Sequence, residues 1–266
     1  MDSRLEANRA HWDELVGVHV RAANAYDLDA FRAGDSTLRS IELEEVGDVR
    51  GKRLLHLQCH FGMNTISWAQ HGAHAVGADF SPEAIALARR LSKELRVEAE
   101  FVCSSIGELP RHLQGQFDVV FTSYGVLCWL PDLVEWGKVI EHFLAPGGCF
   151  YIVEQHPLVT ALSDRDGELV VSESYFDVGP IEETRDGSYA DASAVLEHKT
   201  SFEWQHSLGD VVSALTTNGF RIEFLHEFPF CMFQALPSMV RGADGWWRVP
   251  GRSDVPFLFS LRASKA

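Results

Sequence analysis

The chain has 266 residues, 46% of them hydrophobic, which is enough for one large α/β domain with a cap. Its formal net charge is −15, from 38 acidic and 23 basic residues, and no basic stretch stands out. Because proteins bind nucleic-acid phosphates through Lys and Arg, this balance argues against a nucleic-acid partner and favours a small molecule.

The cysteines and the apolar runs indicate the compartment. Five cysteines, at positions 59, 103, 128, 149 and 231, form no Cys-x-x-Cys pair, as suits buried thiols in a reducing compartment. The N-terminus shows no basic-then-apolar signal, and no apolar run reaches the roughly 18 residues of a membrane span. We therefore expect a soluble, cytoplasmic monomer or homodimer with no membrane partner. His71 and His74 lack a third ligand nearby, so we predict no metal site.

The first element along the chain is an amphipathic helix. Ser3 and Glu6 have the spacing of a capping box, and the apolar pattern then predicts a helix to about residue 23. We expect residues 1–45 to form an N-terminal helical lid.

Short apolar strands then alternate with helices. Strands are predicted near 53–58, 74–79, 98–103, 117–123 and 148–154, and helices near 62–71, 82–95 and 131–143. This alternation predicts a doubly wound, Rossmann-like and mostly parallel sheet, whose first and fourth strands end side by side where ligands bind. Residues 46–156 and 206–266 are assigned to this domain.

Residues 157–205 interrupt the alternation. The stretch is rich in Asp, Glu, Ser and Gly, and it is too long for an ordinary loop. We predict an inserted cap, with strands, over the mouth of the site. A helix near 207–218 follows, and then two strands near 220–225 and 256–261 that are expected to pair as a C-terminal antiparallel hairpin.

The most informative segment, residues 54–86, has the pattern of a nucleoside-binding βαβ unit. An apolar strand leads into a tight turn at Gly62, and the next strand ends at Asp79, 17 residues later. A carboxylate at about this distance accepts hydrogen bonds from a ribose diol in Rossmann-type units. A dinucleotide dehydrogenase would need three glycines where the chain has only Gly62, so this interpretation is weak.

Four ordered motifs resemble the class I S-adenosylmethionine-dependent methyltransferases. They are the strand and loop at 56–62, the acidic strand end at 76–81, the fourth strand and its tail at 117–132, and the Leu-x-Pro-Gly-Gly turn at 144–148. The resemblance implies that S-adenosylmethionine is the cofactor and a small molecule the methyl acceptor. It also implies a set of cofactor-binding positions, namely Gln58, Cys59, His60, Gly62, Asp79, Phe80, Ser81, Ser105, Ile106 and Thr122.

The chain departs from the family pattern at two places. The family's loop has three glycines, of which only Gly62 remains, and Ser105 stands where the family has an aspartate. His60 is tolerated because His is among the side chains found at positive φ. Gln58 is compatible with cofactor binding if its backbone is extended and its side chain turns away from the ligand. The hydroxyl of Ser105 can still meet an adenine amino group.

The acceptor side is expected at the ends of the fourth and fifth strands. Tyr124 and Trp129 follow the fourth strand, and His156 and Glu154 end the fifth. His156 is the candidate base, and Glu154 is a candidate for orienting an amine or hydroxyl, although both residues also suit structural roles. The family's N-terminal lid implies that Trp12, His19 and Tyr26 face the site; alternatively the first helix only covers the sheet edge. Trp204, at the end of the inserted cap, is a further candidate for binding the acceptor.

Two functional classes remain open. One is methyl transfer to an oxygen or nitrogen of a small, partly aromatic or uncharged acceptor held beneath the cap. The other is a non-catalytic S-adenosylmethionine-binding protein on the same fold.

Overall fold

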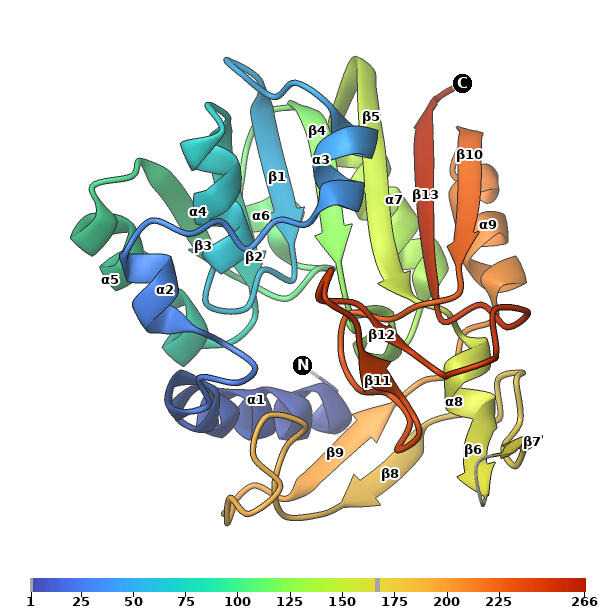
Figure 1. The fold of residues 1–266 in the computed structure, drawn as a ribbon. Helices are drawn as coiled ribbons and strands as arrows, with labels where there is room; N and C mark the ends of the chain where they lie inside the picture. The colour runs from blue at the N-terminus through green and yellow to red at the C-terminus, as the bar shows by residue number, and fades with distance from the viewer. Residues whose placement is uncertain (1, 166–167) are drawn as a thin grey trace.

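The computed structural model describes residues 2–165 and 168–266, and a mixed sheet of seven strands lies at its centre (Figure 1). Across the sheet the strand order is β10-β13-β5-β4-β1-β2-β3. The strands are β1 (Arg53–Leu57), β2 (His74–Asp79), β3 (Ala99–Cys103), β4 (Phe117–Ser123), β5 (Leu144–Gln155), β10 (Phe220–Phe228) and β13 (Leu258–Lys265). β13 runs antiparallel to both β5 and β10, while β1 to β5 are mutually parallel. The predicted doubly wound sheet with an antiparallel C-terminal hairpin is confirmed.

Helices cover both faces of the sheet. One face carries α3 (Ser40–Val46), α4 (Met63–Gln70) and α5 (Pro82–Leu95), and the other carries α6 (Leu109–His112), α7 (Leu133–Phe143) and α9 (Leu208–Thr217). Alternate residues of β1 show the division: Leu54 packs with Trp68 of α4, whereas Leu55 packs with Trp136 of α7. Both faces are therefore buried, as a parallel sheet requires.

The start of each helix follows from its local sequence. Ser81 accepts a hydrogen bond from the N–H of Ala84 at 3.0 Å, and Pro82 opens α5, as the sequence predicts. The predicted capping box of the first helix is wrong, because α1 (Ser3–Arg21) begins at Ser3 itself and Asp2 is its N-cap. The Asp2 carboxylate accepts from the N–H of Arg4 at 2.9 Å.

The first helix, α1, and a pair of strands that follows β5 meet at the carboxyl edge of the sheet (Figure 1). α1 lies along β9 (Thr200–Glu203), which pairs with β8 (Ile181–Thr184). The Asn8 side chain donates to the carbonyl of Phe202 and accepts from its N–H, at 2.7 Å in each case. The remaining elements are α2 (Leu28–Arg32), η1 (Leu127–Trp129), α8 (Leu158–Ala161), β6 (Leu162–Arg165), β7 (Glu168–Val171), β11 (Val240–Arg241) and β12 (Trp247–Arg248).

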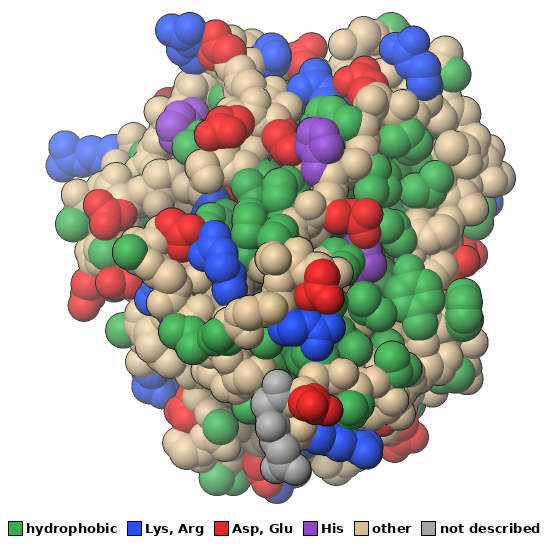
Figure 2. All heavy atoms as spheres, turned by 45° about the vertical axis from the view of Figure 1, so that its right-hand side comes forward, with side chains coloured by type: hydrophobic (Ala, Val, Ile, Leu, Met, Phe, Trp, Pro, Cys, Tyr) green, Lys and Arg blue, Asp and Glu red, His purple; other side chains and the backbone are tan. Residues whose placement is uncertain are grey.

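The surface carries mixed charge on the face that Figure 2 shows. Lys and Arg side chains are dispersed there among Asp and Glu rather than gathered into one basic patch. Among the described residues, no helix is both long and apolar enough to cross a membrane.

Candidate functional site

Asp79 ends β2, and its carboxylate binds the loop that follows β1. Its Oδ2 accepts from the N–H of His60 at 2.8 Å, and its Oδ1 accepts from the N–H of Ser81 at 3.0 Å. The side chain is only 7% exposed. Burial raises the pKa of Asp79 to about 6, although both backbone hydrogen bonds act in the opposite direction. The acid and the loop thus form one hydrogen-bonded unit.

The loop adopts a glycine-like conformation without the glycines. Gln58 and His60 have φ of 54° and 52°, both in the left-handed region. Gln58 therefore lacks the extended backbone that the sequence-based expectation requires for unimpaired cofactor binding, and its Nε2 donates to the carbonyl of Val126 at 2.9 Å. At Gly62 a Cβ would lie 2.5 Å from the ring of Phe101, which explains why this glycine remains.

Helix α1 closes over this loop. Asp13 accepts from the Ser81 hydroxyl at 2.5 Å, beside Asp79. The Trp12 ring lies 5.5 Å from that of His60 and 5.2 Å from that of Trp129, which belongs to η1 after β4. The structure thus brings Trp12, His60 and Trp129 together from three separate elements.

A second group of rings continues from His60. The His19 ring lies 5.2 Å from His60 and stacks on Tyr26 at 5.1 Å. The hydroxyl of Tyr26 is hydrogen bonded to that of Tyr189, which comes from the segment between β8 and β9. His19 and Tyr26 are predicted at the site from the sequence, whereas Tyr189 and Asp13 are not. The one sequence signal for Tyr189 is that it is an isolated aromatic residue in a polar segment.

Three of these rings, those of Trp12, His19 and His60, carry buried polar atoms without hydrogen-bond partners in the described part of the chain. Among the described residues, the buried side-chain atoms without a hydrogen bond include Trp12 Nε1, His19 Nδ1 and Nε2, Gln58 Oε1, His60 Nε2 and Thr122 Oγ1. Buried polar groups in native proteins are nearly always hydrogen bonded, so this concentration indicates a site for polar ligand groups. Burial lowers the pKa of His19 to about 4 and that of His60 well below its usual range, so both rings are neutral at pH 7.

Glu154 holds the turn that follows β4. Its carboxylate accepts from the backbone N–H groups of Gly125, Val126 and Leu127, the last two at 2.8 and 3.3 Å. This turn leads into η1 and Trp129. Glu154 therefore positions this turn by accepting hydrogen bonds from its backbone, and this role requires no contact with a ligand.

His156 lies toward the antiparallel edge of the sheet. Its Nδ1 accepts from the N–H of Leu158 at 3.1 Å, and its Nε2 is 2.9 Å from a carboxylate oxygen of Glu227 on β10. Its ring approaches Phe259 of β13. These partners lie on the β10 and β13 side of β5, whereas Asp79 lies on the other side, beyond β4 and β1.

Two predicted acceptor residues have other neighbours. Tyr124 packs in the apolar cluster beneath α3, close to the buried Glu42, and burial raises the pKa of the Tyr124 hydroxyl. The backbone N–H of Trp204 donates to the carbonyl of Cys128 at 2.8 Å, and the guanidinium of Arg4, at the start of α1, lies over the Trp204 ring. The structure thus brings neither ring into the group around His60.

The other predicted cofactor residues surround Asp79. The N–H of Cys59 donates to the carbonyl of Ala78 at 3.0 Å, and Phe80 follows Asp79 directly. The N–H of Ser104 donates to the Asp79 carbonyl at 2.8 Å, which places Ser105 next to the end of β2. The Ile106 side chain belongs to the core, so only its backbone is available to a ligand.

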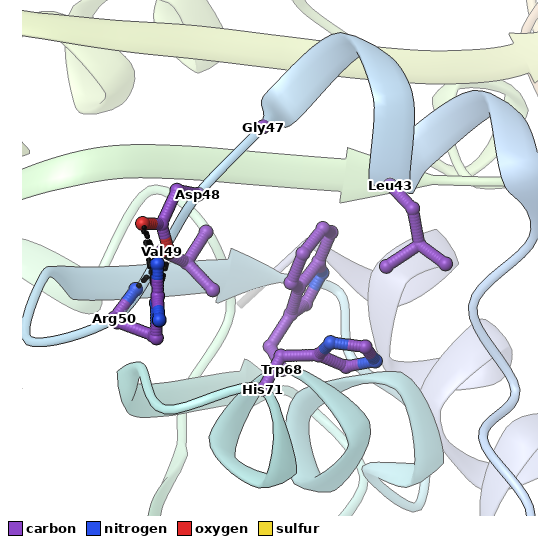
Figure 3. A pocket seen from close by; sticks show the side chains of 7 residues that line it. All are labelled: Leu43, Gly47, Asp48, Val49, Arg50, Trp68 and His71. Carbon is purple, nitrogen blue, oxygen red and sulfur yellow. Dashed lines mark hydrogen bonds and ion pairs between the residues drawn. The ribbon is translucent and has the colours of Figure 1, made fainter.

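A cavity of about 410 Å³ lies at the opposite edge of the sheet (Figure 3). Its lining residues are Leu43, Gly47, Asp48, Val49, Arg50, Trp68 and His71. Asp48 and Arg50 form an exposed ion pair on one wall, and Trp68 and Leu43 lie on another. This cavity lies at the amino ends of β1 and β2, whereas ligands of doubly wound sheets bind at the carboxyl ends, so we assign the site to the Asp79 region.

Comparison with known proteins gives a consistent result. A family model described as "Methyltransferase domain" matches residues 55–150. Ubiquinone biosynthesis O-methyltransferase of Xanthomonas euvesicatoria pv. vesicatoria (strain 85-10) is 27% identical over 154 residues, 57% of this chain and 64% of that enzyme. Magnesium-protoporphyrin O-methyltransferase of Rhodobacter capsulatus is 33% identical over 114 residues, 40% of this chain and 50% of that enzyme. The matched segment thus spans less than two thirds of each of these two relatives.

A solved structure shows the shared fold over nearly the whole chain. The S-adenosylmethionine-dependent methyltransferase from Mesorhizobium loti aligns with a TM-score of 0.59 and 21% identity, covering 92% of this chain and 99% of that one. At this identity the likeness concerns the fold alone.

Proposed function

Because this chain belongs to the class I S-adenosylmethionine-dependent methyltransferases, we propose that it transfers a methyl group to an oxygen or nitrogen of a small-molecule acceptor. The family's methyl donor is S-adenosylmethionine, which supplies an electrophilic methyl group on a sulfonium and becomes S-adenosylhomocysteine. What remains for the protein is to bind both reactants, align them and exclude water.

The observation that carries the proposal is the Asp79 unit beneath α1. A buried carboxylate at the end of β2 is hydrogen bonded to the loop after β1, and the His60 of this loop carries a buried Nε2 that has no partner among the described residues. Asp79 would accept hydrogen bonds from the ribose hydroxyls, and Ser105 and the backbone of Ile106 would meet the adenine. The residues present therefore fit a nucleoside, although Gln58 and His60 replace glycines.

The acceptor would lie against α1 and the turn after β4. Trp12, Tyr26 and Trp129 supply flat apolar surfaces next to His60. The contact of α1 with β9 supports a cover over the same edge, which would keep water away from the reacting groups. Glu154 acts through the turn that it holds, because its oxygens are bound to backbone N–H groups.

Calorimetric titration with S-adenosylhomocysteine tests the proposal, after mass spectrometry of the purified protein for nucleoside that co-purifies. We expect a micromolar dissociation constant, about −8 kcal/mol. No binding at millimolar nucleoside would overturn the proposal. Binding without methyl transfer to any hydroxyl or amine acceptor in a metabolite screen would favour the non-catalytic alternative.

A further inference from the structure

His19 is the most completely enclosed polar side chain of the ring group. It is 0% exposed, and within the described part of the chain neither of its ring nitrogens has a hydrogen-bond partner. Its ring lies 5.8 Å from Trp12 and 5.2 Å from His60, each of which also has an unpartnered buried nitrogen. Trp12 and His60 are themselves 5.5 Å apart. Three mutually adjacent side chains thus each carry a buried nitrogen without a hydrogen-bond partner among the described residues.

The chemistry of these nitrogens restricts what can satisfy them. A neutral imidazole has one donor and one acceptor nitrogen, and an indole only donates. A protonated amine only donates and would leave the Trp12 N–H unpaired, whereas a carboxylate only accepts and would leave the basic nitrogen of His19 unpaired. A hydroxyl does both with one oxygen, so it matches these nitrogens better than either charged group does. Leaving a buried polar group without a partner is unfavourable, which makes this match selective.

The surroundings of the nitrogens favour a flat ligand. The rings of Trp12 and Trp129 meet edge to face at 5.2 Å, and Tyr26 stacks against His19. Aromatic walls with a few convergent polar groups suit an aromatic body that carries a polar substituent.

We propose that the methyl acceptor is an aromatic compound with a neutral hydroxyl, and that His19 accepts the hydrogen bond of this hydroxyl and then its proton. The inference rests on the proposed function and specifies its acceptor. In the transfer, the acceptor oxygen forms a bond to the methyl carbon, and the carbon–sulfur bond breaks with its electron pair left on sulfur. The hydroxyl proton passes to the free nitrogen of His19 and from there to water.

Ligand-observed NMR with phenol, benzylamine and benzoate as probes, in the presence of S-adenosylhomocysteine, tests the inference. The variant His19→Phe keeps a ring but removes both nitrogens, and His19→Gln restores one donor and one acceptor. His11→Phe is the matched control, because His11 lies on the same helix, is also buried, and bonds the carbonyl of His198 instead.

We expect wild type and the His11 control to bind phenol in preference to the two charged probes. His19→Phe should weaken phenol binding at least tenfold, and His19→Gln should recover part of it. In ¹⁵N spectra, phenol should move a ring nitrogen signal of His19. Nucleoside affinity should change less than threefold in every variant.

Equal phenol binding by wild type and His19→Phe, or a preference for benzylamine or benzoate, would overturn the inference while leaving the proposed function intact. A parallel loss of nucleoside affinity in His19→Phe would assign the nitrogens to the cofactor and also overturn it. If wild type binds no nucleoside, the inference fails together with the proposed function.

Discussion

The backbone N–H of His60 donates to the Asp79 carboxylate across 2.8 Å, which joins the loop after β1 to the end of β2. The left-handed conformation of His60 directs this N–H toward the acid, and the ring of the same residue lies against Trp12 of α1. One residue thus couples the acid, the loop and the covering helix. Changes to Asp79, to His60 or to the Asp13 contact of α1 should therefore affect nucleoside binding.

Asp79→Asn should weaken S-adenosylhomocysteine binding by about 1.5–3 kcal/mol, the range for a hydrogen bond to a charged group. Because the pKa of Asp79 is raised to about 6, wild-type affinity should also fall as the pH drops through 6, and the variant should not show this dependence. Calorimetry between pH 5 and 8 measures both effects. Identical pH profiles in the two proteins would exclude Asp79 as the ribose ligand.

The same residue should affect folding stability with a defined sign. The native pKa of about 6 lies above the ordinary aspartate value of 3.8, so the native state binds the proton more tightly than the unfolded chain. The contribution of Asp79 to the free energy of unfolding is therefore largest below pH 4 and is lost as the pH rises from about 4 to about 6. Urea denaturation of wild type and Asp79→Asn across this window measures the free energy of unfolding, which should fall with rising pH more steeply in wild type than in the variant. Parallel plots of this free energy against pH would contradict the raised pKa of Asp79.

Asp13→Ala should loosen α1, because Asp13 accepts from the Ser81 hydroxyl at 2.5 Å and bonds the N–H of Glu83 at 3.4 Å. We expect about 1 kcal/mol lower stability and faster nucleoside association, observed by stopped-flow fluorescence of the tryptophans. Removing the charge beside Asp79 should also lower the pKa of that acid. Glu6→Ala, an exposed change on the same helix, is the control. Equal association rates in the two variants would show that α1 does not limit entry.

Elements with strong local signals were predictable from the sequence. The bounds of β2 and α5 agree with the prediction, because Ser81 and Pro82 fix the helix start through their own backbone chemistry. β5 begins four residues earlier than predicted. The sequence indicates a turn at Pro146 and Gly147, but the strand pairing begins at Leu144, opposite Phe117.

The candidate site was predictable only in part, since its contacts join distant segments. Asp79 and the loop were accessible because one βαβ unit contains both. Tyr26 and Tyr189 are 163 positions apart, and no periodicity relates them. The role of Glu154 was equally hidden, because its partners are backbone N–H groups, which every residue except proline has.

Glu154→Ala should destabilise the protein strongly, since it leaves the N–H groups of Gly125, Val126 and Leu127 without their acceptor. We expect a loss of about 3 kcal/mol or more, because each buried unsatisfied group costs about 1–3 kcal/mol. Chemical denaturation measures the loss, with the exposed change Glu98→Ala as the control. A loss below 1 kcal/mol would mean that the turn does not depend on Glu154.

The last prediction concerns His156, whose contacts favour a structural role over that of a base. Burial lowers the pKa of His156 and the neighbouring Glu227 opposes this effect, while the Nδ1 atom accepts from the N–H of Leu158. His156→Ala should therefore reduce stability by about 1–3 kcal/mol through the lost partners. Nucleoside affinity should not change, and turnover should fall less than tenfold once an acceptor is known. His156→Gln, which keeps an acceptor for the Leu158 N–H, should recover part of the stability.

General-base catalysis contributes about 10²–10⁴ in rate, so a hundredfold loss of turnover in both variants with unchanged stability would establish His156 as the base. Because His156 and Asp79 lie on opposite sides of β4 and β1, that result would also require the acceptor to extend from the nucleoside site to the antiparallel edge of the sheet.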